Sequence, residues 1–162
     1  MSAKSNYLEA KILDHTLKNT AFTQPTTLAL ALFVTGSDTD AVVEGHAEAN
    51  SATWLGYEVA TATGYARATI TFDPAQTSVG TDEGSGAEDD ITSAVGPAVA
   101  GGIEFDNDGT GDFGTVTWFG IYDNATHNAG NLLYFGKLTA SKAIANGDTL
   151  RFAQDAITIK EA

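Results

Sequence analysis

Apolar residues in this chain occur in short runs or alternate with polar residues, a pattern typical of β-strands. The apolar run between Pro25 and Gly36 predicts a buried strand over 27–35. In the segment 65–72, Ala66, Ala68, Ile70 and Phe72 alternate with Arg67, Thr69 and Thr71, which predicts a half-buried strand. By the same criteria we expect further strands at 54–60, 114–122, 131–138, 150–153 and 156–160.

The N-terminal residues 5–18 have a different pattern, which predicts a short amphipathic helix. Ser5 or Asn6 can cap its start, and Asn19 can end it. A helix this short is marginal alone, so we expect its apolar residues to dock on the rest of the domain or on a neighbouring subunit. The apolar residues expected on roughly one face, and therefore at this interface, are Leu8, Ile12, Leu13 and Leu17.

Turn residues separate the predicted strands. The segment 124–130 is expected to join two strands as a hairpin, and 146–148 is a tight-turn signal. Short strands, frequent turns and one leading helix predict a mainly β fold, an antiparallel β-sandwich or jelly-roll-like domain with a short N-terminal helix. We expect a helical arm at 1–20 and a single domain at 21–162, with acidic insertions at about 36–56 and 73–112.

The charge of the 162-residue chain, formally −13, is concentrated in its middle. Residues 38–112 hold 15 of the 21 acidic residues and one basic residue, Arg67, which gives −14, whereas the flanks sum to +1. This segment is interpreted as a solvated acidic surface, with a docking surface for a basic partner or a cation-binding surface as alternatives. Such a charge disfavours nucleic acid and anionic membranes as partners. The longest apolar run is too short to span a membrane, and no signal peptide is expected.

Candidate chemistry is sparse. The chain has no Cys, which excludes disulfides and thiolate metal sites. His15, His46 and His127 fit no metal or catalytic spacing and are interpreted as surface or capping residues. The segment 81–90 is predicted to be an exposed charged loop. We therefore expect no catalytic residues and no cofactor, with a hydrolase that uses the acidic region as the enzymatic alternative.

The segment 106–112 is similar to the first half of a calcium loop. Carboxylates at its positions 1, 3 and 7, Thr at position 5 and Gly at position 6 could supply hard oxygen ligands. It departs from the EF-hand pattern because position 12 is Thr117 rather than Glu, so an ordinary acidic turn is the alternative. The candidate ligands are Asp106, Asp108, Thr110 and Asp112.

Several blocks in the C-terminal third resemble a known family. They are Gly114-Thr-Val-Thr-Trp-Phe-Gly-Ile-Tyr-Asp123, Gly130-Asn-Leu-Leu-Tyr-Phe-Gly-Lys-Leu-Thr139 and Gly147-Asp-Thr-Leu-Arg-Phe-Ala153. With N-terminal blocks such as Leu13-Asp-His15 and Gly64-Tyr-Ala-Arg67, the chain resembles small virion structural proteins of tailed bacteriophages, often labelled tail-fibre or minor tail proteins. The resemblance covers most of the chain outside about 36–56 and 73–112.

This resemblance implies a non-enzymatic virion protein made in the bacterial cytoplasm. We expect an oligomeric capsid decoration or cement protein on the particle exterior. Its implied partners are itself, as a homotrimer, and the major capsid protein or tail proteins. The alternatives are a tail or tail-fibre-associated protein, or a carbohydrate- or receptor-binding module. The aromatic residues available for stacking on sugars are Trp54, Tyr57, Trp118 and Tyr122, although the last two could equally be core residues of one strand face.

Overall fold

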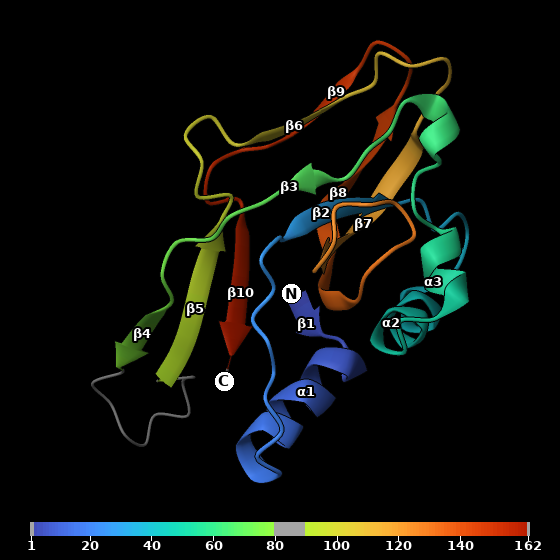
Figure 1. Cartoon of the computed structure of the whole chain (residues 1–162). Coiled ribbons are helices and arrows are strands. Elements are labelled where there is room, and N and C mark those ends of the chain that lie inside the picture. Colours follow the sequence, from blue (N-terminus) through green and yellow to red (C-terminus); the bar gives the residue numbers. More distant parts are fainter. Residues whose placement is uncertain (1, 80–89, 162) are drawn as a thin grey trace.

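The computed structural model describes residues 2–79 and 90–161, which form a β-sandwich with two helices on one outer face (Figure 1). The strands are β1 (Ser2–Lys4), β2 (Ala29–Phe33), β3 (Ala68–Thr69), β4 (Gln76–Val79), β5 (Asp90–Gly96), β6 (Ile103–Asp106), β7 (Gly114–Tyr122), β8 (Leu132–Ile144), β9 (Thr149–Phe152) and β10 (Ile157–Glu161). The helices are α1 (Asn6–Leu17), α2 (Asp40–Glu48), α3 (Ala52–Gly56) and the short 3-10 helix η1 (Thr61–Thr63). The predicted mainly β, antiparallel fold with a leading helix is confirmed.

The larger sheet has the strand order β1-β8-β7-β2-β3, and every pairing in it is antiparallel. The β7–β8 hairpin confirms the two strands predicted at 114–122 and 131–138, although β8 continues to Ile144. Val116 pairs with Lys142 but Trp118 pairs with Lys137, so β8 contains a bulge between these two lysines. The edge strand β1, which the sequence pattern did not predict, pairs with β8.

Strand β7 is buried on both faces, because successive side chains point to opposite sides of a strand. Phe119 and Ile121 contribute to the core of the sandwich, whereas Trp118 and Tyr122 belong to a second core on the opposite face. The interpretation of Trp118 and Tyr122 as core residues of one strand face is confirmed. The larger sheet therefore separates two apolar layers.

The second layer of the sandwich contains a three-stranded sheet, β10-β5-β4, and the β6–β9 ribbon. Strands β9 and β10 confirm the predictions at 150–153 and 156–160. The segment 73–102, in which the sequence analysis predicts no strand, contains β4 and β5. The charged loop predicted at 81–90 lies outside the described residues except for Asp90, which begins β5. Side chains from both layers meet in one core, which includes Leu30, Leu32, Phe105, Phe119, Phe152 and Ile159.

The acidic insertion expected at about 36–56 contains helices α2 and α3, which the sequence analysis did not predict. The strand predicted at 54–60 was wrong, because Trp54 lies in α3 and its backbone N–H donates to the Ser51 side chain that caps this helix. Val43 and Ala47, four residues apart on α2, are buried against the larger sheet together with Trp54. The helices therefore cover one face of that sheet with apolar residues and leave the acidic ones outside.

The strand predicted at 65–72 is reduced to the two residues of β3. The expected alternation was also wrong at its centre, because Arg67 is buried whereas Ala66 is exposed. Arg67 can point inward because a carboxylate meets it inside the fold, as described below.

Helix α1 confirms the helix predicted over 5–18. The Ser5 side chain accepts a hydrogen bond from the Leu8 backbone N–H, and Asn19 follows the helix with a φ of 54°. Only Leu8 of this helix is buried. The expectation that Leu8 and Leu17 share a face was wrong, because nine residues correspond to about 2.5 helical turns and place the two side chains on opposite sides.

Candidate functional site

A closed cluster of charged and aromatic residues lies where α3, β3 and the β7–β8 loop meet. The Arg67 guanidinium forms a bidentate pair with Glu58, with Nε 2.7 Å from Oε1 and Nη2 2.8 Å from Oε2. Both side chains are fully buried. This pair satisfies both buried charges, and such planar pairs are among the strong hydrogen-bonded contacts in proteins.

Arg67 also holds the loop between β7 and β8. Its Nη1 donates to the carbonyl oxygens of Asn124 and Ala129, at 2.9 Å and 2.8 Å. Its Cζ lies 3.7 Å from the centre of the Tyr122 ring, within the range of a cation–π contact. One side chain therefore joins the acidic segment, the central strand and the hairpin loop.

Two further side chains complete the cluster. The Tyr65 hydroxyl accepts from the Leu32 backbone N–H at 3.0 Å and donates to Glu58 at 3.3 Å. Burial, reinforced by the charge of Glu58, raises the pKa of Tyr65 far above its usual value. The Nε2 of His127 lies 3.1 Å from the carbonyl oxygen of Val59 and 3.9 Å from Glu58. Because Glu58 and Arg67 are paired with each other away from solvent, neither charged group is exposed to a substrate.

This cluster was missed by the sequence analysis, although one signal pointed to it. Arg67 is the one basic residue within the acidic segment 38–112. A lone cation in such a segment can mark a buried ion pair, but its partner Glu58 is one of 15 acidic residues there, so the sequence could not single it out.

The predicted calcium loop begins at Asp106, the last residue of β6, and continues into the connection to β7, and three of its candidate ligands take part in hydrogen bonds. Asp106 accepts from the Thr149 hydroxyl at 2.6 Å, Asp112 accepts from the Asn146 backbone N–H at 2.9 Å, and Thr110 donates to a backbone carbonyl at 3.2 Å. Over 2–79 and 90–161, no group of three or more His, Asp or Glu side chains could hold a metal ion. Calcium binding by Asp106, Asp108, Thr110 and Asp112 stays a prediction, which isothermal titration tests.

The three histidines lie in separate environments. The Nδ1 of His15 accepts from the Phe22 backbone N–H at 3.3 Å, and His46 lies 3.3 Å from the Ser51 hydroxyl. His127 belongs to the closed cluster. The first two therefore make local contacts near helix ends, whereas His127 is part of a tertiary contact.

The four aromatic residues suggested for sugar binding do not form a surface. Trp54 and Tyr122 are completely buried, and Trp118 is 3% exposed. Trp54 stacks on Phe33 with ring centres 4.0 Å apart, so its faces are occupied by core contacts. Tyr57 is the one residue of the suggested set that reaches the surface, where its hydroxyl donates to Asp38. That hydrogen bond raises the pKa of Tyr57.

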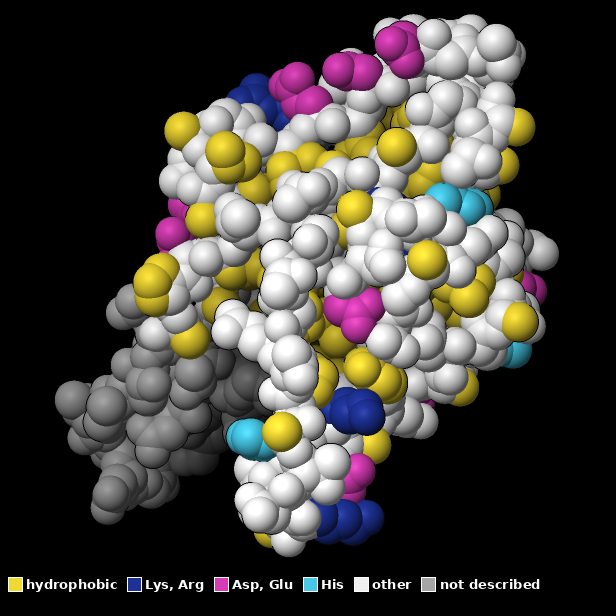
Figure 2. Space-filling model, viewed as in Figure 1, with side chains coloured by type: hydrophobic (Ala, Val, Ile, Leu, Met, Phe, Trp, Pro, Cys, Tyr) yellow, Lys and Arg dark blue, Asp and Glu magenta, His cyan; other side chains and the backbone are white. Residues whose placement is uncertain are grey.

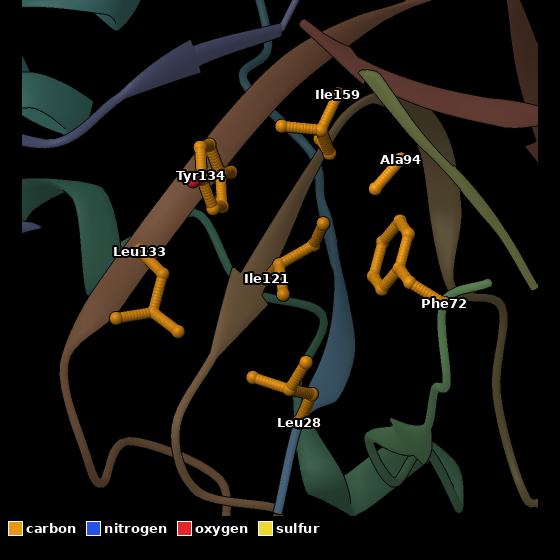
Figure 3. A pocket seen from close by; sticks show the side chains of 7 residues that line it. All are labelled: Leu28, Phe72, Ala94, Ile121, Leu133, Tyr134 and Ile159. Atoms are coloured by element: carbon orange, nitrogen blue, oxygen red, sulfur yellow. The ribbon is translucent and has the colours of Figure 1, made fainter. Parts of the chain in front are cut away.

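An apolar cavity lies between the two layers of the sandwich (Figure 3). It has a volume of about 180 Å³ and is partly open. Its walls come from β5, β7, β8 and β10 and from the segments next to β2 and β3, so no single stretch of sequence could have revealed it. The lining residues are Leu28, Phe72, Ala94, Ile121, Leu133, Tyr134 and Ile159.

Comparison with known proteins identifies the family. Residues 3–160 match the family model described as "Podophage GP4 fiber I protein gp80". The chain therefore belongs to this family of bacteriophage fibre proteins, and it is a virion protein. The resemblance to virion structural proteins of tailed phages is thus confirmed.

The remaining comparisons add little. No curated protein matches the chain closely enough to be counted as a relative. Within the described residues, no helix is long and apolar enough to cross a membrane.

Proposed function

We propose that this protein is a structural component of a tail fibre of the virion. The observation that carries the proposal is the family match, which spans nearly the whole chain, from residue 3 to residue 160. The match supports the tail-fibre alternative of the sequence analysis better than its main expectation, capsid decoration.

We further propose that the role is mechanical rather than catalytic. Glu58 and Arg67, which pair with both side chains fully buried, neutralise each other inside the fold. The sandwich is stabilised on both faces of its larger sheet by large aromatic and aliphatic residues. Such a doubly covered sheet suits a part that must keep its shape under load.

The partners proposed are two further copies of the same chain, which complete the expected homotrimer, and neighbouring tail proteins. Residues 1–20 are proposed to act as the arm of this assembly, because most of the apolar residues of α1 remain exposed. The acidic residues on α2 and around β6 are proposed to remain in solvent on the exterior of the fibre.

Quantitative mass spectrometry of separated phage heads and tails tests this assignment. We expect the protein to co-purify with the tail and fibre fraction, at a ratio to the other tail proteins that is constant between preparations. Recovery with the heads, in proportion to the major capsid protein, would instead establish capsid decoration and overturn the proposal.

A further inference from the structure

Helix α1 presents apolar side chains to solvent. Ile12, Leu13 and Leu17 are 37%, 56% and 78% exposed, whereas Leu8 packs on the body of the protein. Leu13 and Leu17 are four residues apart and therefore neighbours on the outer side of the helix. A 12-residue helix gains little stability from its backbone alone, so an apolar outer face of this kind calls for a partner.

The inter-sheet cavity offers a matching receptor. Its lining side chains converge from both layers and are almost entirely apolar (Figure 3). Apolar protein cavities of about 150 Å³ take up a molecule as large as benzene. The cavity here, at about 180 Å³, therefore has room for one leucine side chain.

Charge favours a second copy of this chain as the partner. Residues 1–28 carry three Lys and two acidic residues, a net charge of +1, whereas residues 29–162 carry five basic and 19 acidic residues, a net charge of −14. Figure 2 shows basic side chains, with acidic ones beside them, around α1, and mostly acidic side chains near the β6–β9 end. Two acidic bodies repel each other, so contact between the arm of one copy and the body of another avoids most of that repulsion.

We infer that α1 of one copy docks on the body of a second copy, with the Leu17 side chain entering the inter-sheet cavity between Phe72, Ala94 and Ile159. The contact joins α1 of one copy to the cavity of another copy. Because these two surfaces differ, the contact is heterologous. Such contacts form a closed ring when the rotation between copies closes, as it would in a trimer. The inference rests on the proposed self-association of the protein and not on its position in the virion.

Light scattering on purified variants tests both surfaces. We expect the wild type to have a mass that is a multiple of the chain mass. Leu17→Glu removes the inserted group and Ala94→Leu fills the cavity, so each should yield a monomer that still folds and melts cooperatively. The matched control is Val42→Glu, which places the same charge at a 46% exposed aliphatic residue on α2, on the other face of the larger sheet, and should keep the wild-type mass.

A cross-linking experiment tests the contact directly and covers the case in which Ala94→Leu does not fold. The chain contains no Cys, so single cysteines can be introduced without competing thiols. Under mild oxidation, a tagged Leu17→Cys protein mixed with an Ala94→Cys protein should form a disulfide-linked heterodimer. The mixture of Val42→Cys with Ala94→Cys should not.

The outcomes separate the two proposals. A monomeric wild type would overturn the proposed self-association and this inference with it. An oligomeric wild type whose mass survives Leu17→Glu, with no Leu17–Ala94 cross-link, would overturn the docking mode alone. Loss of the oligomer in Leu17→Glu together with the cross-link supports it.

Discussion

The guanidinium of Arg67 lies over the ring of Tyr122, with Cζ 3.7 Å from the ring centre. Tyr122 is the last residue of the central strand β7, and Arg67 comes from the connection between η1 and β3. The same guanidinium pairs with Glu58 and donates to the β7–β8 loop. Arg67 is therefore one of the side chains that fix the β7–β8 hairpin, which carries most of the family resemblance, to the acidic segment 38–112.

Removing the cation alone should be severely destabilising. In Arg67→Met, Glu58 is left as an unpaired buried carboxylate, and breaking a buried pair in this way costs about 3–5 kcal/mol. We expect urea unfolding of Arg67→Met to show a loss of that size in the free energy of unfolding. The double variant Glu58→Leu/Arg67→Met buries no lone charge and should recover a large part of the loss. A double variant as unstable as the single one would show that the hydrogen bonds to the loop, and not the charge, dominate.

Stability should fall in alkali. Burial raises the pKa of Tyr65 above its usual value of 10.0, so the folded state binds this proton more tightly than the unfolded state. The resulting stabilisation is fully present below about pH 10 and decreases as the pH rises above it. Burial also raises the pKa of Tyr122, which adds to the same loss of stability in alkali. Urea unfolding between about pH 8 and about pH 11 measures the decrease, which should be shallower in Tyr65→Phe. An equal slope in Tyr65→Phe would show that this hydroxyl is not the source.

Two glycines of the β6–β7 loop make a matched pair. A Cβ at Gly109 would lie 1.8 Å from the carbonyl oxygen of Thr63, so the backbone of one segment must move to admit a methyl group. A Cβ at Gly111 would lie 3.8 Å from the Thr63 methyl group, an ordinary contact. We expect Gly109→Ala to lower stability by about 1–3 kcal/mol, as overpacking does, and Gly111→Ala to change it far less. Equal melting temperatures for the two variants would show that the loop does not approach Thr63 so closely.

Substitution of Trp54 separates a core role from a binding role. Trp54, a residue of α3, is completely buried and stacks on Phe33. Trp54→Ala should therefore lower the free energy of unfolding by about 3–5 kcal/mol. Tyr57→Ala removes a half-exposed ring from the end of the same helix and should cost much less. Thermal melts compare the two. A Trp54→Ala protein as stable as the wild type would show that Trp54 is not a core residue and is accessible to a ligand.

Sequence pattern predicted the elements that combine a run of apolar residues with clear turn residues at the flanks. The runs at β2, β7 and the first half of β8 were recovered because apolar positions and turn residues agree there. The helix α1 was predicted from its cap residues and apolar spacing, but its faces were misjudged, because Leu8 and Leu17 were expected at one interface and lie on opposite sides.

The missed features depend on tertiary contacts. Around Trp54, bulky residues suggested a strand, whereas the Ser51 cap and the apolar face of the larger sheet favour a helix. Arg67 looked like an outward-facing strand residue because its partner Glu58 is nine residues away and not distinguishable by type. The cavity is formed by residues from six parts of the chain, and only the fold brings them together.

A cryo-electron microscopy map of the intact virion tests the central claim most directly. The β-sandwich, with helices α2 and α3 on one face, has a shape that can be located in such a map (Figure 1). We predict that it fits density in the fibres attached to the tail, in several copies per fibre. Density for this fold on the outer surface of the capsid lattice, with none in the fibres, would contradict the assignment.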